Sequence, residues 1–416
     1  MRIAIVGGGS SGLVAAYLLG DRHEVHLYEC GPQVGGHVRT LGQNVNVDSF
    51  PPGKVAENGP SGFHVATSPT FMRLLAELRI PTKSFAFGSN LFLRDDQDHF
   101  IRPDLQHWRR RFIEPTTGGL ETALSLIRFL VRTRSSRVNR NGHKQLADAL
   151  PHKPFLRDWF RCILMLCFSR PMELVDSLPI SFASTMLRQG LLHAEWKFIP
   201  GGVYSYQAKI LSQFGGQVFL NSPVDRVFRD ESGVRLSVQG NLTAQYDKLI
   251  IATPPGRVLS MLDRPTAIEA KFFSEWGSEI PFRTITHTDL TMYRNKRSAR
   301  PTIADFFQRD EETFGYNCCV SRLYSGTNEF NFSYNMDDLI EPAKRLDSHE
   351  HRIPAYSVAA LRHRQELIAA NGDHDTFYAG AYLDFGLHEG AVSSANQVAR
   401  LLGERSLTVA EPPQQL

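Results

Sequence analysis

The sequence has few cysteines, and they form no pattern that holds a metal or a disulfide framework. The five are Cys30, Cys162, Cys167, Cys318 and Cys319, with no CxxC pair among them. A disulfide scaffold and a cysteine-based zinc site are therefore not expected. Unpaired cysteines fit a reducing compartment, so the sequence predicts a cytoplasmic protein.

A targeting signal and long apolar runs are also missing. The chain begins "MRIAIVGGG", which is typical of a strand that runs into a glycine turn and not of a signal peptide. No run approaches the roughly 18 apolar residues that a transmembrane helix needs. We therefore expect no membrane-spanning segment.

Neither sign of charge dominates, since the sequence has 46 Lys and Arg and 43 Asp and Glu, which gives a net charge of +3. This balance does not suggest a nucleic-acid partner. Residues 101–160 are the exception, with twelve basic and five acidic residues (+7), which leaves −4 for the remainder. Arginines there are mixed with Trp, Phe and Leu. The segment predicts either a membrane-surface or acyl-carrier contact, or simply a helix with a solvated face followed by an arginine-rich loop.

Clusters of Asp, Glu and His occur in "DDQDH", "HEH" and "DHD". We interpret all three as solvated, loop-like stretches, and no metal site is predicted.

The length favours two domains. A strand, turn, helix and strand cover residues 2–29, short strands follow between 217 and 251, and a strand, loop and helix lie between 376 and 402. Residues 66–190 look mainly helical and residues 265–370 mixed. We predict an α/β protein with a discontinuous Rossmann-like domain (1–65, 196–264 and 375–405), an inserted α+β substrate domain (66–195 and 265–374) and a flexible tail (406–416).

The first turn carries Gly7-x-Gly9-x-x-Gly12 between a strand and a helix. The first glycine makes the turn, the second admits a pyrophosphate, and the third lets helix and strand pack closely. The helix N-terminus offers free N–H groups to the phosphates. Glu29 ends the next strand, where a carboxylate accepts hydrogen bonds from a ribose diol and repels the 2′-phosphate of NADP. The pattern predicts a dinucleotide site.

A second glycine pair, in "CGPQVGGHVRT" (30–40), indicates whether the predicted dinucleotide is FAD or NAD. Gly35 and Gly36 let the backbone fold against the same pyrophosphate from the other side. His37 and Arg39 can supply compensating positive charge. A domain that only holds NAD has no evident need for these residues, so FAD is favoured.

Together these motifs resemble the double-glycine flavoprotein superfamily, which includes monoamine and polyamine oxidases, protoporphyrinogen oxidase and carotenoid desaturases. Thr40 matches the family pattern, whereas His37 stands where arginine is usual. Three further segments are similar: "AENGPSGFH" (56–64), "EWKFIPGG" (195–202) and "AGAYLDFGLHEGAVSSANQVARLL" (379–402). The chain looks nearest to bacterial predicted NAD/FAD-binding proteins and to a domain fused to cyclopropane fatty acid synthases in plants.

The resemblance implies an FAD-binding domain and an FAD-dependent oxidoreductase. It places a helix N-terminus at the flavin edge where negative charge builds up on reduction. The residues it assigns to the cofactor are Gly7, Gly9, Ser10, Ser11, Gly12, Glu29, Gly35, Gly36, His37, Val38, Arg39, Thr40, Gly59, Pro60, Ser61, Val224, Thr253, Gly380, Glu389, Gly390, Ala391 and Val392.

One side chain is a catalytic candidate. Amine oxidases of this family place a lysine on a substrate-domain strand, linked through water to the flavin, and by register His287 in "RTITHTDLTMY" takes that position. A histidine can act there as a base or orient a water. The alternative is a histidine that hydrogen-bonds a neighbour in a polar core.

The substrate pocket lacks a feature of amine oxidases, which hold the amine between two aromatic rings. One ring position is Leu387 here, followed by His388. Tyr382 and Phe385 can face the pocket, although core packing explains them equally well. We predict dehydrogenation of a lipophilic, acyl-type small molecule. Three alternatives are a flavin amine oxidase, an FAD-dependent double-bond isomerase and a non-catalytic FAD-binding partner protein.

Overall fold

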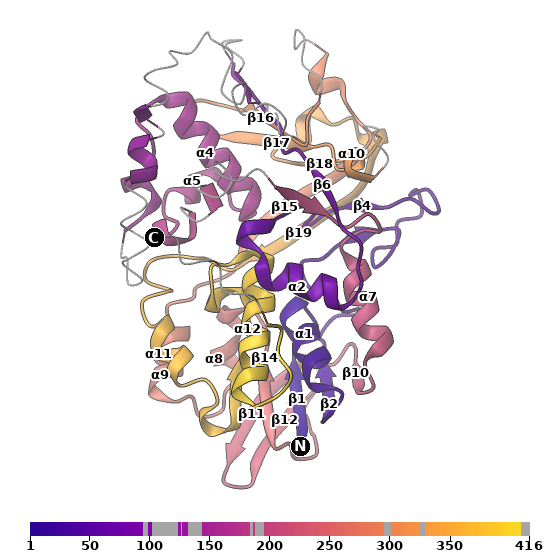
Figure 1. Cartoon of the computed structure of the whole chain (residues 1–416), viewed down its shortest axis with the longest axis vertical. Coiled ribbons are helices and arrows are strands. Elements are labelled where there is room, and N and C mark those ends of the chain that lie inside the picture. Colours follow the sequence, from indigo (N-terminus) through magenta and orange to yellow (C-terminus); the bar gives the residue numbers. More distant parts are fainter. Residues whose placement is uncertain are drawn as a thin grey trace.

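The computed structural model describes residues 1–94, 99–101, 124–125, 127–131, 144–183, 186–187, 195–294, 301–324 and 329–408. The chain forms two lobes, each built around one large sheet (Figure 1). Much of the basic segment 101–160 lies outside the described residues, so its contact with a membrane surface or carrier stays a prediction. None of the described helices is both long and apolar enough to cross a membrane.

The lower lobe in Figure 1 contains a parallel sheet of five strands. Their order is β10 (Gln217–Phe219), β2 (Glu24–Tyr28), β1 (Arg2–Val6), β14 (Lys248–Ile251) and β20 (Thr376–Tyr378). Strands β1 and β14 are continuous apolar runs and are almost fully buried, as expected for parallel strands covered on both faces. The sheet joins segments that are far apart in sequence, and the predicted α/β class is confirmed.

Four helices pack together beside this sheet. Helix α1 (Ser10–Leu19) contacts α12 (Leu387–Leu401) and α7 (Tyr204–Gln213), and α12 also contacts α2 (Pro69–Glu77). Helix α2 begins with Pro69 at its first position, where the missing N–H of proline has no helical partner to lose. The predicted strand, loop and helix near the C-terminus are also present, with the helix beginning at Leu387.

An antiparallel hairpin projects from the lower end of this lobe. It consists of β11 (Val224–Asp230), β12 (Gly233–Val238) and β13 (Asn241–Leu242). Helices α8 (Val258–Met261), α9 (Ala267–Phe273) and α11 (Arg364–Ala369) lie nearby. Arg229 forms a buried ion pair of 2.6 Å with Glu269, which also accepts a hydrogen bond from the Tyr378 hydroxyl. This pair fastens the hairpin to strand β20.

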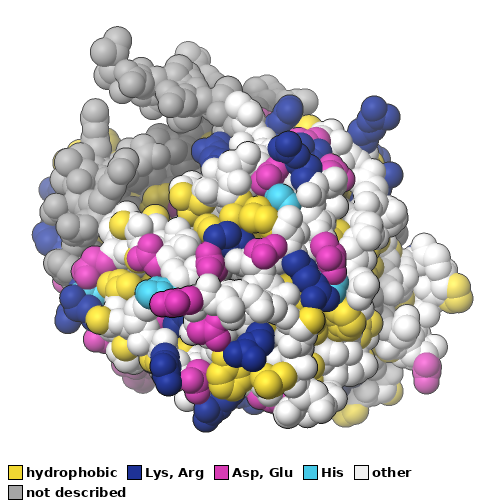
Figure 2. Space-filling view, turned by 90° about the horizontal axis from the view of Figure 1, so that it is seen from below, with side chains coloured by type: hydrophobic (Ala, Val, Ile, Leu, Met, Phe, Trp, Pro, Cys, Tyr) yellow, Lys and Arg dark blue, Asp and Glu magenta, His cyan; other side chains and the backbone are white. Residues whose placement is uncertain are grey.

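The lobe's lower face mixes charges of both signs. In Figure 2, Lys and Arg side chains alternate with Asp and Glu over the described part of this face. Examples are the exposed pairs Arg2–Glu24 and Arg226–Asp263.

The upper lobe is built on a mixed sheet of seven strands. Their order is β19 (Arg345–Ile353), β15 (Ile280–His287), β18 (Asn331–Tyr334), β17 (Phe314–Cys318), β16 (Ala304–Gln308), β7 (Ser89–Phe92) and β8 (His99–Ile101). All neighbours are antiparallel except β16 and β7. The "HEH" residues 349–351 lie within β19, so the loop interpretation of this cluster is wrong.

Helices and short sheets complete the upper lobe. The elements are α4 (Pro154–Cys167), α5 (Met172–Val175), α10 (Ser321–Tyr324), the pair β3 (Thr40–Leu41) and β4 (Ala56–Glu57), and the sheet of β5 (Phe63–His64), β9 (Trp196–Phe198) and β6 (Lys83–Phe85). Helix α4 confirms one predicted helix. The expectation that 66–190 is mainly helical overlooked β6, β7 and β8, whose three or four residues are too short to give a clear alternation.

Short 3-10 helices connect these elements: η1 (Val65–Thr67), η3 (Leu146–Asp148), η4 (Pro255–Arg257), η5 (Thr291–Tyr293), η6 (Asp337–Leu339), η7 (Pro342–Lys344), η8 (Asp373–Asp375) and η9 (Ala381–Leu383). The tail prediction needs a correction at its start. Leu407 is buried, and its backbone exchanges hydrogen bonds of 2.6 and 3.0 Å with the Asn396 side chain. Residues 409–416 lie outside the described part of the chain.

Candidate active site

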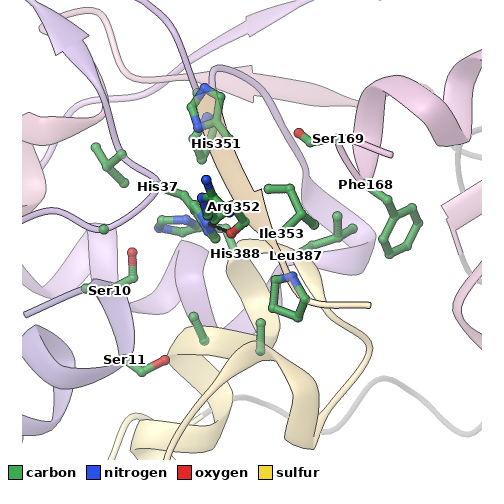
Figure 3. A pocket seen from close by; sticks show the side chains of 18 of the residues that line it. Ser10, Ser11, His37, Phe168, Ser169, His351, Arg352, Ile353, Leu387 and His388 are labelled. Carbon is green, nitrogen blue, oxygen red and sulfur yellow. Dashed lines mark hydrogen bonds between the residues drawn. The ribbon is translucent and has the colours of Figure 1, made fainter. Parts of the chain in front are cut away.

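A cavity of about 920 Å³ lies between the carboxyl ends of β1, β2 and β14 and one face of the seven-stranded sheet. In Figure 3, His37, Arg352 and His388 converge between Ser10 on one side and Leu387 on the other. Predicted residues that line the cavity are Gly7, Gly9, Ser10, Ser11, Glu29, Gly36, His37, Val38, Gly59, Pro60, Ser61, Val224, Thr253, Gly380, Tyr382, Leu387, His388 and Ala391.

The turn between β1 and α1 requires glycine for steric reasons. Gly7 has φ +109°, and a Cβ there would lie 2.6 Å from the carbonyl oxygen of Ala252. A Cβ on Gly12 would collide with the carbonyl oxygen of Gly7, so Gly12 permits close packing without lining the cavity itself. Ser10 and Ser11 line the cavity at the start of α1, where the first N–H groups of a helix are free to bind an anion.

The second glycine pair packs directly against this turn. The N–H of Gly35 donates to the carbonyl oxygen of Gly8 at 2.9 Å. Gly36 has φ +59°, and a Cβ on it would lie only 3.0 Å from the Cα of Gly9. The two glycine turns therefore meet backbone to backbone, and their predicted contact with a pyrophosphate from two sides stays a prediction.

Glu29 connects the same two turns. Its carboxylate accepts hydrogen bonds from the N–H groups of Gly8 and Gly31, each at 2.7 Å. The carboxylate also lines the cavity. Oε1 also accepts a weak hydrogen bond of 3.2 Å from the Cys30 thiol, whereas Oε2 keeps an acceptor position that a ribose hydroxyl can use.

Arg39 and Thr40 are oriented differently from the prediction. Arg39 forms a 3.0 Å ion pair with Asp347 on β19, and Thr40 donates to the buried Glu57 carboxylate at 2.8 Å. Neither residue lines the cavity. Arg39 is drawn away because a half-buried carboxylate competes for it, and its predicted role as the pyrophosphate's counter-charge is wrong. His37 does line the cavity, and its Nε2 donates to the Arg352 carbonyl at 2.9 Å.

The buried carboxylate of Glu57 connects three segments of the chain through hydrogen bonds. It accepts hydrogen bonds from Thr40, from the N–H of Val203 at 2.7 Å and from the Tyr324 hydroxyl at 3.2 Å. Burial raises the pKa of this carboxyl to about 7. These hydrogen bonds connect the "AENGP" and "GGHVRT" motifs to each other and to the start of α7.

Glu389 also has a structural role that the sequence did not indicate. Its carboxylate accepts hydrogen bonds of 2.9 Å from the N–H groups of Thr70 and Phe71, at the N-terminus of α2. Gly390 packs against the Ala381 backbone, and Val392 is fully buried in the core. Of the four predicted residues in this helix turn, only Ala391 lines the cavity.

The backbone before α12 is strained where it borders the cavity. Gly386 and Leu387 have φ +71° and +57°. A left-handed leucine costs roughly 1–2 kcal/mol, and such outliers cluster at functional sites. Phe385 does not line the cavity and is 47% exposed, so its assignment to the pocket is wrong.

A network around His388 was not foreseen. Its Nε2 lies 2.8 Å from the Tyr206 hydroxyl, which contacts the Ser10 hydroxyl at 2.9 Å. The Gln207 amide donates to Ser10 at 3.2 Å and to the Gly35 carbonyl at 3.3 Å. Burial and then the nearby His37 lower the pKa of His388 to about 3, so the ring is neutral. Tyr206 and Gln207 lie in an ordinary amphipathic helix sequence, which gave no sign of this contact.

His287 lies on the wrong side of the sheet for catalysis. On β15, Thr284 lines the cavity, whereas His287 does not and is fully buried. Side chains alternate along a strand, so an odd number of residues separates the two faces. The prediction that His287 faces the flavin is wrong, and the alternative of a histidine in a polar core is correct.

Hydrogen bonds account for both ring nitrogens of His287. Nδ1 accepts from the N–H of Asp289 at 3.1 Å, and Nε2 contacts the Ser333 hydroxyl at 2.8 Å. Burial lowers the pKa of His287 to about 4. The cavity face offers Thr284 instead, whose hydroxyl donates to the Asn58 amide oxygen at 2.5 Å.

The far end of the cavity is apolar. It is formed by α4, the residues after it, and the sheet face. We call it the apolar compartment; its described side chains are Leu166, Cys167, Phe168, Met186, Tyr316, Cys318, Val320, Leu323 and Phe332, together with one serine, Ser169, next to Phe168.

The cavity suits the FAD predicted from the motifs. Glycines of both turns line the cavity, so the backbone borders it there without a Cβ in between, and Glu29 lines it beside them, where a ribose would lie. Two buried hydroxyls that line the cavity, Thr253 Oγ1 and Tyr382 OH, have no hydrogen-bond partner among the described residues. Buried polar atoms are normally paired, so these two await a ligand.

Similar structures have the same fold over almost the whole chain. A CLA-producing fatty acid isomerase from P. acnes has a TM-score of 0.69 and 14% identity, with 96% of this chain and 98% of that chain covered. Cyclohexylamine oxidase from Brevibacterium oxydans IH-35A has a TM-score of 0.71 and 16% identity, covering 97% and 99%. Putrescine oxidase bound to putrescine has a TM-score of 0.68 and 16% identity, covering 97% and 99%. At these identities the likeness shows the fold alone.

A comparison with curated protein sequences finds no match. The family model of flavin-containing amine oxidoreductases matches residues 10–295, which is more than half of the chain. The predicted superfamily, FAD as cofactor and an oxidoreductase activity are thereby confirmed. The chain belongs to the flavin-containing amine oxidoreductase family and is an FAD-dependent, amine-oxidase-like enzyme.

Proposed function

We propose that this enzyme removes a hydride from a lipophilic, uncharged substrate of the acyl type. The observation that carries the proposal is the apolar compartment at the far end of the cavity. Binding pockets with such linings draw their affinity from apolar burial, at roughly 25 cal/mol per Å². A hydrocarbon chain is the substrate that gains most binding affinity from contact with these apolar side chains.

The distribution of charge supports this over amine oxidation. The two acidic residues in the described lining are Glu29, held by backbone N–H groups, and Glu279, which pairs with Arg257 at 3.2 Å. Neither belongs to the apolar compartment. Burying an ammonium group without a carboxylate is costly, and Leu387 replaces an aromatic ring of the amine cage.

The chain's own residues have defined tasks in this mechanism. When bound, FAD supplies the two-electron acceptor, because its ring system takes a hydride from a substrate carbon. Both glycine turns, Glu29 and Thr253 would hold the cofactor. The N-terminus of α12 favours negative charge at its end. His388 is neutral, so it contributes a hydrogen bond and no charge.

Double-bond isomerisation is a second candidate. Dehydrogenation also releases a proton, yet the described lining of the apolar compartment contains no carboxylate, lysine or histidine to accept it. In an isomerisation, a hydride taken from an allylic carbon by bound FAD would return to the other end of the allyl unit, so no base would be needed. The described lining of the apolar compartment offers no base, since the histidines of the wider lining, His37, His64, His351 and His388, lie outside it, and this favours the isomerisation route.

Product analysis tests the proposal. The FAD-loaded protein is incubated in air with an unsaturated long-chain methyl ester and, separately, with the matching primary amine. We expect the ester to gain a double bond with oxygen consumption, or to shift its double bond without it. Oxidation of the amine to an aldehyde, with the ester untouched, would overturn the proposal. Conversion of neither would leave the FAD-binding partner role as the better account.

A further inference from the structure

Strand β17 places a tyrosine in the apolar compartment. Tyr316 and Cys318 point to the cavity face, because each is two residues from the other along the strand and both line the cavity. Tyr316 is only 1% exposed. Its ring packs between Phe282, Phe332 and Tyr334, at centroid distances of 6.4, 5.8 and 5.7 Å. The ring is therefore fixed in position.

The ring of Tyr316 is buried, and no described residue forms a hydrogen bond with its hydroxyl, which is not fully enclosed and so is open to the cavity. Other buried tyrosines differ, since Tyr293 donates to Asp305 at 2.7 Å and Tyr378 donates to Glu269 at 2.6 Å. Burial raises the pKa of Tyr316 well above its ordinary value, so the hydroxyl keeps its proton. A hydroxyl that faces the cavity with no partner among the described residues is a donor that a ligand there can use.

The surroundings limit what that ligand group can be. The nearest polar groups are the thiols of Cys167 and Cys318 and the Tyr334 hydroxyl, all of them uncharged. Arg352 lines the cavity elsewhere, but its guanidinium is 59% exposed and pairs with Glu350 at 2.7 Å. A carboxylate in the apolar compartment would lack a cation, which makes its burial costly. A neutral carbonyl oxygen accepts the hydrogen bond without that cost.

We propose that the Tyr316 hydroxyl donates a hydrogen bond to the carbonyl oxygen of a neutral acyl substrate, an ester, thioester or amide, and so positions the acyl chain along the cavity. This inference rests on the proposed function, because it assumes an acyl substrate. It makes Tyr316 a specificity-determining residue. No bond is broken at this residue.

The test is a binding measurement on the FAD-loaded protein. One unsaturated long-chain skeleton is used as its methyl ester, primary amide, free acid, amine and plain alkene, and dissociation constants are read from perturbation of the flavin absorption. We expect the ester and amide to bind wild type about tenfold more tightly than the alkene and the acid. In Tyr316→Phe this advantage should fall by about five- to tenfold, as expected for one hydrogen bond, while alkene binding stays unchanged.

A matched control is Tyr334→Phe, which removes a hydroxyl from the neighbouring strand outside the cavity lining. It should leave all five constants unchanged. Equal binding of the ester by wild type and Tyr316→Phe would overturn the inference while the proposed function survives. Should Tyr316→Phe fail to fold, equal binding of ester and alkene by wild type overturns the inference just as well. Tight binding of the amine alone would contradict the proposed function itself.

Discussion

The two faces of the seven-stranded sheet differ in how their polar side chains are hydrogen-bonded. On the face away from the cavity, the hydroxyl of Ser333 donates to the Asn317 side chain at 2.8 Å, and the chain of hydrogen bonds continues through Tyr293 to Asp305. On the cavity face, the Thr286 hydroxyl is buried without a partner among the described residues, no described residue forms a hydrogen bond with the Tyr316 hydroxyl, and the Thr284 hydroxyl is bonded to Asn58. The hydroxyl of Ser333 is thus fully bonded, whereas that of Thr286 is not, although Arg345 Nε beside His287 also lacks a partner among the described residues.

The face on which a side chain lies separates structural from functional polar residues better than residue type does. His287 is the residue that chemistry would choose, yet it belongs to the face away from the cavity. Tyr316 and Thr284 look ordinary in the sequence, yet they line the cavity. The strand register, and not the residue type, therefore decides which polar side chains of this sheet reach the cavity.

The largest effect should come from breaking the hydrogen-bond network on the face away from the cavity, at Asp305. Its carboxyl group accepts from the Tyr293 hydroxyl at 2.7 Å, the Asn90 amide at 2.8 Å and the Thr302 N–H at 2.8 Å. Asp305→Ala leaves several buried donors unpaired, so it should lower the free energy of unfolding by about 3–5 kcal/mol. Urea unfolding of the FAD-loaded protein measures this. The exposed Asp48→Ala is the control with little change, and a similarly small loss at Asp305 would contradict the network's importance.

Lowering the pH should lower the free energy of unfolding, because the fold keeps several buried histidines neutral. Burial lowers the pKa of His351 and His388 to about 3 and of His287 to about 4. Between pH 4.5 and 6.5 the unfolded chain binds these three protons and the folded chain does not. Glu57 has the opposite effect. Its pKa is raised to about 7, so over this range the folded chain binds one proton there that the unfolded chain does not.

Two net protons give a slope of about 2.7 kcal/mol per pH unit, so stability present above pH 6.5 is lost as the pH falls. Urea unfolding at a series of pH values measures the slope. His287→Asn should reduce it by about one proton, or 1.4 kcal/mol per pH unit. A flat profile over this range would show that the histidines are not held neutral by the fold.

Replacing His287 should affect stability without affecting turnover. His287→Leu leaves the N–H of Asp289 without its acceptor and removes one of the two hydrogen bonds of the Ser333 hydroxyl, which should cost about 1–3 kcal/mol. Because His287 lies outside the cavity lining, kcat/KM of the folded, FAD-loaded variant should stay within about twofold of wild type. A drop of a hundredfold or more would restore His287 as a catalytic residue.

The smallest effects should have opposite signs on the two faces. Thr286→Val removes a buried hydroxyl that has no partner, so the free energy of unfolding should stay the same or rise by up to about 1 kcal/mol. Ser333→Ala removes a fully bonded hydroxyl and should lower it by about 1–2 kcal/mol. Losses of the same size at both positions would erase the distinction between the faces.

The sequence predicts the cofactor end of the site well. Glycine turns, the strand before them and the helix after them are local patterns, and their steric reasons can be stated from residue types alone. The apposition of Gly35–Gly36 and the first turn followed from the same reasoning. The structure adds distances but changes little there.

Roles set by distant partners could not be predicted. Arg39, Thr40 and Glu389 match motif positions, but their partners Asp347, Glu57 and the N-terminus of α2 are brought to them only by the fold. His287 failed because a shift of one residue exchanges the faces of a strand. The pairing of β15 with β19 is irregular between Thr286 and His287, which a register argument cannot foresee.

The most direct measurement is an anaerobic titration of the yellow, FAD-loaded protein with the unsaturated ester and with its matching amine. An uncharged cavity face predicts that the ester perturbs or bleaches the flavin absorption and that the amine leaves it unchanged. Bleaching by the amine, with no response to the ester, would contradict the assignment of this enzyme to acyl substrates.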